Sequence, residues 1–156
     1  MADVLAVAEY ILDKTGYVST MKLQKLAFYS NALSLVRYGE PLFPEQFQAW
    51  VNGPVCRDLL RVHRGKFIIG PGELGVSPGY DSLNAHERAC VDETVRVLGG
   101  YDGNGLSELT HGEPPWRDAR DGCEDSARCE AIISNEAIRS FYSSRECANP
   151  LFSSAR

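Results

Sequence analysis

Three histidines are the side chains best suited to general acid–base chemistry, because the ordinary pKa of histidine lies close to neutral pH. His63 falls near the end of an expected helix and His86 in the first turn of another, where structural or surface roles are favoured. His111 stands beside other unusual residues, and as a catalytic base it would need an orienting carboxylate such as Glu108 or Glu113. One histidine without a full catalytic constellation favours a structural or recognition role, which we expect for His111.

The cysteines, glycines and serines indicate no metal site, phosphate site or activated nucleophile. Cys123 and Cys129 have no histidine at the spacing of a zinc site. The five cysteines are an odd number without a Cys-x-x-Cys pair, which favours reduced thiols over a disulfide framework. The glycine-rich residues 99–105 read as a loop between two helices, and no Gly-x-Ser-x-Gly elbow is present. We therefore expect no metal, no cofactor and no catalytic residue, with an enzyme based on His111 as the minor alternative.

Charged residues gather in two stretches of opposite sign. Arg57, Arg61 and Arg64 recur at helical spacing with Lys66 close by, and form either a solvated helix face or a surface for an anion or a partner. Residues 102–130 carry more acids than arginines, and opposite surfaces of this kind favour electrostatic steering of a protein partner. These acids are Asp102, Glu108, Glu113, Asp118, Asp121, Glu124, Asp125 and Glu130.

The two tryptophans lie beside turn-forming residues. Trp50 precedes Gly53 and Pro54, and Trp116 follows two prolines. Large aromatic side chains in such places are core anchors or interface hot spots, and core burial is the favoured interpretation. Trp50 alternates with its strand neighbours Ala49 and Val51, so it needs cover from a helix or from a partner.

Hydrophobic periodicity predicts an α+β fold that is mostly α-helical, a compact helical domain with a small antiparallel sheet or hairpin. Helices are expected at residues 3–14, 19–38, 54–64, 84–98 and 106–111, with a further turn at 116–120 and a last helix after Ser134. Strands are expected at residues 46–51 and 66–69, paired with each other. Pro54 is placed as the first residue of its helix.

The helix at residues 19–38 carries apolar side chains on more than one side, which indicates that it is the central helix. We assign residues 1–145 to a single domain and residues 146–156 to a poorly ordered tail rich in polar residues.

Composition narrows the class of protein further. The chain has 156 residues, 44% of them hydrophobic, and a net charge of −5. It is too apolar for disorder, and its acidity argues against a dedicated nucleic-acid binder. No apolar run is long enough to span a membrane, and the N-terminus does not resemble a secretory signal. We expect a cytoplasmic protein with no membrane partner.

An ordered set of short motifs resembles the Panacea antitoxin domain, to which the SocA-type bacterial antitoxins belong. The motifs are Met21-Lys22-Leu23-Gln24-Lys25-Leu26, Gly39-x-Pro41-Leu42, Phe47-x-Ala49-Trp50-x-x-Gly53-Pro54-Val55, Tyr101-x-Gly103, Leu109-Thr110-His111-x-Glu113-x-Pro115-Trp116-x-x-Ala119-Arg120, and Ile132 through Ile138 to Phe141-Tyr142. The resemblance covers nearly the whole chain, from the first helix to about Tyr142.

The resemblance implies an antitoxin from a bacterial or phage toxin–antitoxin pair. Members of the family neutralise unrelated toxins by direct protein contact, including small alarmone synthetases and other translation inhibitors. One branch instead acts as an adaptor that delivers its toxin to an ATP-dependent protease, which is the alternative function. The partner implied is a cognate protein toxin, and the resemblance leaves open whether the chain also forms a homodimer. Relatives that bind DNA carry an added module for which this chain has no room, so direct DNA binding is not expected.

The residues expected to bind the partner, or to form the motif that supports binding, come from these segments. They are Lys22, Gln24, Lys25, Trp50, Gly53, Pro54, Arg57, Thr110, His111, Glu113, Trp116, Asp118 and Arg120. Acids would stand in for the phosphate groups that the toxin binds. We therefore expect charge reversal of Glu113 and Asp118 to weaken neutralisation and to leave the fold intact.

Overall fold

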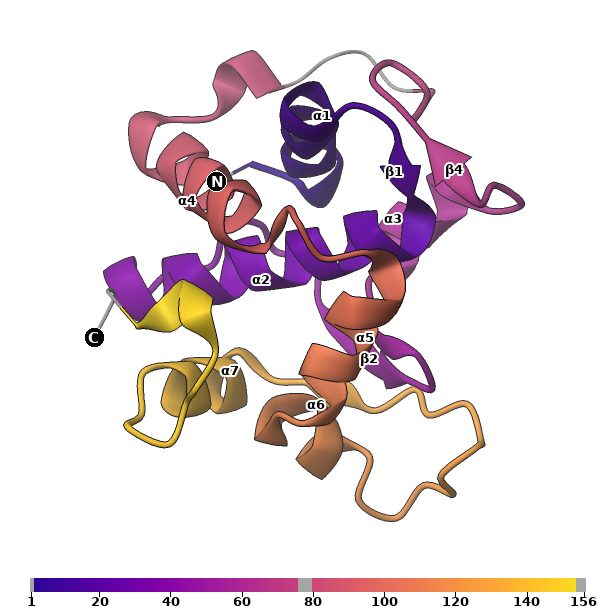
Figure 1. Ribbon diagram of the computed structural model, residues 1–156, viewed down its shortest axis with the longest axis vertical. Coiled ribbons are helices and arrows are strands. Elements are labelled where there is room, and N and C mark those ends of the chain that lie inside the picture. Colours follow the sequence, from indigo (N-terminus) through magenta and orange to yellow (C-terminus); the bar gives the residue numbers. More distant parts are fainter. Residues whose placement is uncertain (1, 76–79, 154–156) are drawn as a thin grey trace.

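A computed structural model describes residues 2–75 and 80–153 of the chain, with seven α-helices and five short strands in that part (Figure 1). The helices are α1 (Val4–Thr15), α2 (Thr20–Tyr38), α3 (Arg57–His63), α4 (Ala85–Leu98), α5 (Gly103–His111), α6 (Pro114–Ala119) and α7 (Asn135–Tyr142). The strands are β1 (Val18–Ser19), β2 (Phe47–Trp50), β3 (Gly53–Val55), β4 (Ile68–Ile69) and β5 (Ile132–Ile133), and two 3₁₀ turns are η1 (Tyr80–Ser82) and η2 (Pro150–Phe152). The expected mostly helical α+β fold is confirmed.

Helix α2 crosses the middle of the molecule, as its apolar pattern predicts (Figure 1). Ser19 caps its start, where the Ser19 hydroxyl accepts a hydrogen bond from the Lys22 amide, and Gly39 ends it in the left-handed conformation. Helices α1, α4, α5 and α7 and strand β3 all pack against α2. Its side chains are buried without a break from Leu23 to Leu35, so this helix forms the centre of the core.

Helices α1 and α4 cover one side of α2 and begin with the predicted caps. Asp3 caps α1 through the Ala6 amide. Asn84 and Glu87 form a reciprocal capping box at the start of α4. None of the helices in residues 2–75 and 80–153 is long and apolar enough to cross a membrane.

The three-stranded sheet corrects the expected role of Pro54. Strands β2 and β3 form an antiparallel hairpin in which Ala49 lies opposite Pro54, and β5 pairs with the other side of β2. Pro54 therefore belongs to an edge strand, where its missing amide hydrogen is tolerated, and α3 begins only at Arg57. The helix expected at residues 54–64 is shorter, so Arg64 lies beyond its end.

The predicted strand at residues 66–69 exists in part, but its predicted partner is wrong. Strand β4 pairs with β1, where Val18 lies opposite Ile69 and Ser19 opposite Ile68, and it makes no ladder with β2. Two-residue strands carry too little alternation to be detected in a sequence, which is why β1 and β5 were not predicted.

The glycine-rich loop expected before residue 106 is partly helical. Helix α5 begins at Gly103, because the Asp102 side chain accepts a hydrogen bond from the Gly105 amide and so caps an earlier turn. An N-cap aspartate outweighed the low helix propensity of the glycines.

The chain after α7 differs from the poorly ordered tail expected at residues 146–156. Cys147, Leu151 and Phe152 are buried and belong to the core. The Phe152 ring stacks on Tyr142, with ring centroids 4.5 Å apart, and η2 packs against α4. Residues 154–156 of the expected tail lie outside the described residues. The polar composition of this segment predicted disorder, although three of its side chains anchor it to the core.

Candidate functional site

The motif residues of α2 reach under the β2–β3 hairpin. The Gln24 side-chain amide donates to the Cys56 carbonyl and accepts from the Cys56 amide, which fastens the end of the hairpin to α2. The Gln24 amide nitrogen also lies 3.0 Å from His63 Nε2. Since that nitrogen is a donor, His63 accepts and is neutral, and burial lowers its pKa in the same direction. Gln24 and His63 are thus structural in this arrangement.

The side chain of Lys25 is fully buried beneath the same hairpin. Its Nζ donates to the Pro54 carbonyl at 3.1 Å, and burial lowers its pKa from 10.5 to about 7. Gly53 has φ of 113°, and a side chain there would bring Cβ to 2.7 Å from Lys25 Cε and 2.9 Å from Thr110 Oγ1. Gly53 is therefore required both by its backbone conformation and by the close approach of Lys25 and Thr110.

Both tryptophans are held by the protein itself. The Trp116 indole donates to the Trp50 carbonyl at 2.7 Å, and His111 stacks on Trp116 with ring centroids 4.1 Å apart. The Arg128 guanidinium covers the Trp50 ring at 4.1 Å. The cover that Trp50 needs thus comes from a side chain of its own chain.

Arg120 is a buried arginine that organises the loop after α6. Its guanidinium donates to the Ala49 carbonyl of β2 and to the carbonyls of Glu124, Asp125 and Ala127. Backbone carbonyls thus replace the carboxylate that a buried cation usually requires. Arg120 therefore positions this acidic loop from within the protein.

A disulfide closes the same loop. Cys123 and Cys129 are bonded, whereas Cys56, Cys90 and Cys147 are free and buried. The expectation that all five thiols are reduced is wrong for this pair. Two cysteines six positions apart on a turn can meet, a geometry that their spacing alone did not reveal.

Glu113 corrects the prediction that its charge reversal leaves the fold intact. Its carboxylate accepts hydrogen bonds from Tyr29 at 2.5 Å, Tyr142 at 2.7 Å and Asn149 at 2.9 Å, and the side chain is buried. Burial raises the pKa of Glu113, and the three donors oppose that rise. Glu113 ties the start of α6 to α2, to α7 and to the C-terminal segment, so it is structural.

Of the two carboxylates that the His111 enzyme alternative could use, Glu113 is bonded elsewhere, whereas Glu108 is exposed on α5, the helix that also carries His111. Glu113 makes its hydrogen bonds on the side of Tyr29 and Tyr142, and within residues 2–75 and 80–153 His111 Nε2 is buried without a hydrogen-bond partner. Burial lowers the pKa of His111. In the same described ranges no group of three or more histidine, cysteine or acidic side chains could hold a metal ion.

Of the remaining predicted site residues, Lys22 serves the fold, whereas Arg57 makes a surface ion pair. Lys22 Nζ donates to the Gly99 carbonyl at 2.6 Å and so joins α2 to the end of α4. Arg57 lies 3.9 Å from Glu130, and Arg61 pairs with Asp58 on its own helix. The expected basic helix face is therefore divided, with two of its arginines paired to acids.

The remaining acids of residues 102–130 do form a surface. Every acid in this range except Glu113 is exposed. Around the loop held by Arg120, Asp118, Asp121, Glu124 and Asp125 face outward; we call these four residues the acidic loop surface. A hollow of about 520 Å³ opens there, lined by Asp118, Asp121 and Asp125 among others.

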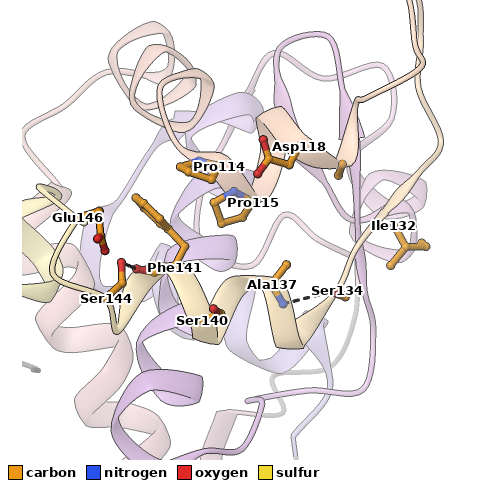
Figure 2. Close-up of a pocket in the computed structure, with 11 residues that line it drawn as sticks. Pro114, Pro115, Asp118, Ile132, Ser134, Ala137, Ser140, Phe141, Ser144 and Glu146 are labelled. Atoms are coloured by element: carbon orange, nitrogen blue, oxygen red, sulfur yellow. Dashed lines mark hydrogen bonds between the residues drawn. The ribbon is translucent and has the colours of Figure 1, made fainter.

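A groove of about 640 Å³ lies between α6 and α7, on the other side of Asp118. Its apolar lining includes Pro115, Ala137 and Phe141, and Figure 2 shows the Phe141 ring pointing toward the two prolines of α6. Its ionisable lining residues are Asp118 and Glu146, both acidic. Of the residues expected to bind the partner or to support binding, Asp118 is the one that lines this groove.

The β1–β4 ribbon carries exposed apolar side chains that the motifs do not include. Phe67 is 88% exposed, Tyr17 67% and Ile68 59%. Arg64 and Lys66 beside them are also exposed, and Glu73 accepts a hydrogen bond from the Tyr17 hydroxyl. This ribbon surface (Tyr17, Arg64, Lys66, Phe67 and Ile68) is therefore apolar, with two cations and one neighbouring acid. The basic stretch was visible in the sequence, but the exposure of Phe67 was not, because a strand of hydrophobic residues normally indicates burial.

Comparisons with known proteins identify the family of the chain. The family model "Antitoxin SocA-like, Panacea domain" matches residues 23–117, more than half of the chain. The chain belongs to this family. It is also 29% identical over 131 residues to antitoxin SocA of Caulobacter vibrioides (strain NA1000 / CB15N), an alignment that covers 73% of this chain and 68% of the relative. No solved structure matches. The family match includes the hairpin and Glu113 but ends before Asp118 and α7, so one wall of the groove lies outside it.

Proposed function

We propose that this chain is an antitoxin that neutralises a cognate toxin by direct protein–protein binding, through the acidic loop surface. Family membership supports the antitoxin role. The observation that carries the mode of binding is the exposure of four acids: Asp118 near the end of α6, and Asp121, Glu124 and Asp125 on the loop that Arg120 fixes from inside.

The charge of this surface suits toxins that act on nucleotides or RNA. Such toxins, small alarmone synthetases among them, must bind phosphate groups with basic residues. Carboxylates held at fixed positions can occupy the same basic site, and a rigid surface loses little conformational entropy on binding. The basic ribbon surface would be repelled from such a site, so charge also orients the antitoxin on the toxin.

Co-expression with the product of the neighbouring gene tests the proposal. We expect growth rescue with the toxin still abundant on a blot, and co-purification of the two proteins. Asp121→Lys with Asp125→Lys should abolish rescue, whereas Asp13→Lys with Glu40→Lys, an equal charge change at exposed sites elsewhere, should preserve it.

Each other outcome has a defined meaning. Unchanged rescue by the loop variant would overturn the role of the acidic loop surface. Depletion of the toxin that is reversed in a protease-deficient host would favour the adaptor function. Absence of both rescue and co-purification would overturn direct neutralisation.

A further inference from the structure

The ribbon surface and the α6–α7 groove are complementary: the ribbon surface presents an exposed ring beside cations, and the groove is an apolar hollow flanked by acids. We propose that a second copy of this chain seats its ribbon surface in the groove, with Phe67 as the inserted side chain. This proposal requires no property of the toxin, and the groove shares one residue, Asp118, with the acidic loop surface.

The ribbon surface supplies the inserted group. Phe67 is 88% exposed, and removing a phenylalanine ring from water favours association. Tyr17 and Ile68 extend the apolar area. The Tyr17 ring lies over Gly70, which is two residues after Ile68. Exposed aromatic side chains gathered in this way mark an interaction surface.

The groove supplies the matching cavity. Its walls are the prolines of α6 and Phe141 of α7, and Ile132 at its edge is 46% exposed (Figure 2). Glu113 connects the two walls, because it is the N-cap residue of α6 and its carboxylate accepts a hydrogen bond from Tyr142 of α7. A cavity fixed by a buried hydrogen-bond network is ready to receive a ring without rearrangement.

Charge determines which apolar surface fits. In the view of Figure 2, Asp118 and Glu146 lie to either side of the Phe141 ring, and Glu146 makes no ion pair among the described residues. Arg64 and Lys66 flank Phe67 closely in sequence on the ribbon. Two ribbons facing each other would bring like charges together, so the groove is the complementary site.

The positions of the two surfaces allow a closed dimer. The β1–β4 ribbon lies toward one end of the molecule's longest axis and the α6–α7 pair toward the other end (Figure 1). Two copies placed side by side and antiparallel would bring each ribbon to the groove of the other copy. Two identical contacts related by a two-fold axis then close the assembly, as in most homodimers.

Charge exchange between two variants gives the decisive experiment. One variant reverses the ribbon (Arg64→Glu with Lys66→Glu), and the other reverses the groove (Asp118→Lys with Glu146→Lys). The wild type should form dimers in a concentration series by analytical ultracentrifugation, whereas each variant alone should associate at least about tenfold more weakly. An equimolar mixture restores opposite charges at both contacts, so it should form dimers again.

A second comparison isolates the apolar contact. Phe67→Ser should weaken self-association about tenfold or more, and Tyr38→Ser, at an exposed tyrosine outside both surfaces, should not. Unchanged melting temperatures would show that all variants are folded. A wild type that stays monomeric throughout the series, or reversed variants that do not recover on mixing, would overturn the proposal. Growth of species beyond the dimer would overturn the closed two-fold arrangement.

Discussion

The β2–β3 hairpin and the α6–α7 groove use polar side chains in opposite ways. Beneath the hairpin, Gln24, Lys25 and Arg120 direct their donors inward to backbone carbonyls of the chain. At the groove, Asp118 and Glu146 direct their charges outward, and Asp118 pairs with its exposed neighbour Arg117. An exposed ion pair of that kind contributes little to stability, so its charges stay available to a partner.

This difference explains which kinds of position the family motif contains. A position under the hairpin accepts few residue types, because one side chain must satisfy buried backbone groups and fit against others. An exposed position tolerates many. The motif therefore marks the framework, and the contact surfaces must be found from exposure and charge.

The largest expected effect separates Glu113 from Asp118. Glu113→Lys should destabilise the protein by about 3 kcal/mol or more, because it removes the acceptor of three buried donors and buries a cation. Asp118→Lys should change the free energy of unfolding by about 0.5 kcal/mol or less, because the side chain is exposed. Urea denaturation of both variants measures the difference.

Glu113→Gln serves as the control for charge. It retains one acceptor and the side-chain volume, so its destabilisation should lie between those of the two lysine variants. Equal stability of Glu113→Lys and Asp118→Lys would contradict the division into framework and surface.

A second prediction compares two glycines of positive φ. Gly53→Ala should destabilise the protein by about 3 kcal/mol, through backbone strain and the contacts of Cβ with Lys25 and Thr110. Gly65, with φ of 86°, has no atom within 4 Å of a built Cβ. Gly65→Ala should therefore cost about 1 kcal/mol from strain alone. Similar melting temperatures for the two variants would show that Lys25 does not approach the hairpin closely.

The pH dependence of stability reports on Lys25. Its pKa falls from 10.5 when unfolded to about 7 when folded, so the unfolded chain binds more protons between these values. The free energy of unfolding should therefore rise with pH from 7 to 9, by up to about 1.4 kcal/mol per pH unit. Below pH 7 Lys25 is protonated in both states, so it contributes no slope there. Lys25→Met should flatten the slope. Measuring the free energy of unfolding of both proteins at several pH values in this window tests the prediction. If wild type and variant had the same slope, Lys25 would not be buried as a neutral amine.

The sequence was sufficient for the main helices and for the family. Asp3, Ser19 and Asn84 cap the helices that their types predict, because capping depends on local backbone geometry. The central position of α2 followed from apolar side chains on several faces. These features depend on neighbours in sequence, which are visible without a structure.

The features that the sequence did not reveal depend on distant partners. The burial of Glu113 rests on Tyr29, Tyr142 and Asn149, which lie 84, 29 and 36 positions away. The pairing of β4 with β1 follows from the course of the chain around α3. No local pattern distinguishes a buried acid from an exposed one, so the sequence could not separate the buried Glu113 from the exposed Asp118.

The smallest expected effect concerns Phe67 and the toxin. Phe67→Ser should change the affinity for the toxin by less than about twofold, because the ribbon surface and the acidic loop surface lie at different ends of the molecule (Figure 1). Titration calorimetry with purified toxin measures this, with Tyr38→Ser as the matched control. The variant should lose self-association under the same conditions, so the two binding events would be separated in one protein. A parallel loss of toxin affinity would instead place the ribbon surface in the toxin interface, and the acidic loop surface would then be only part of it.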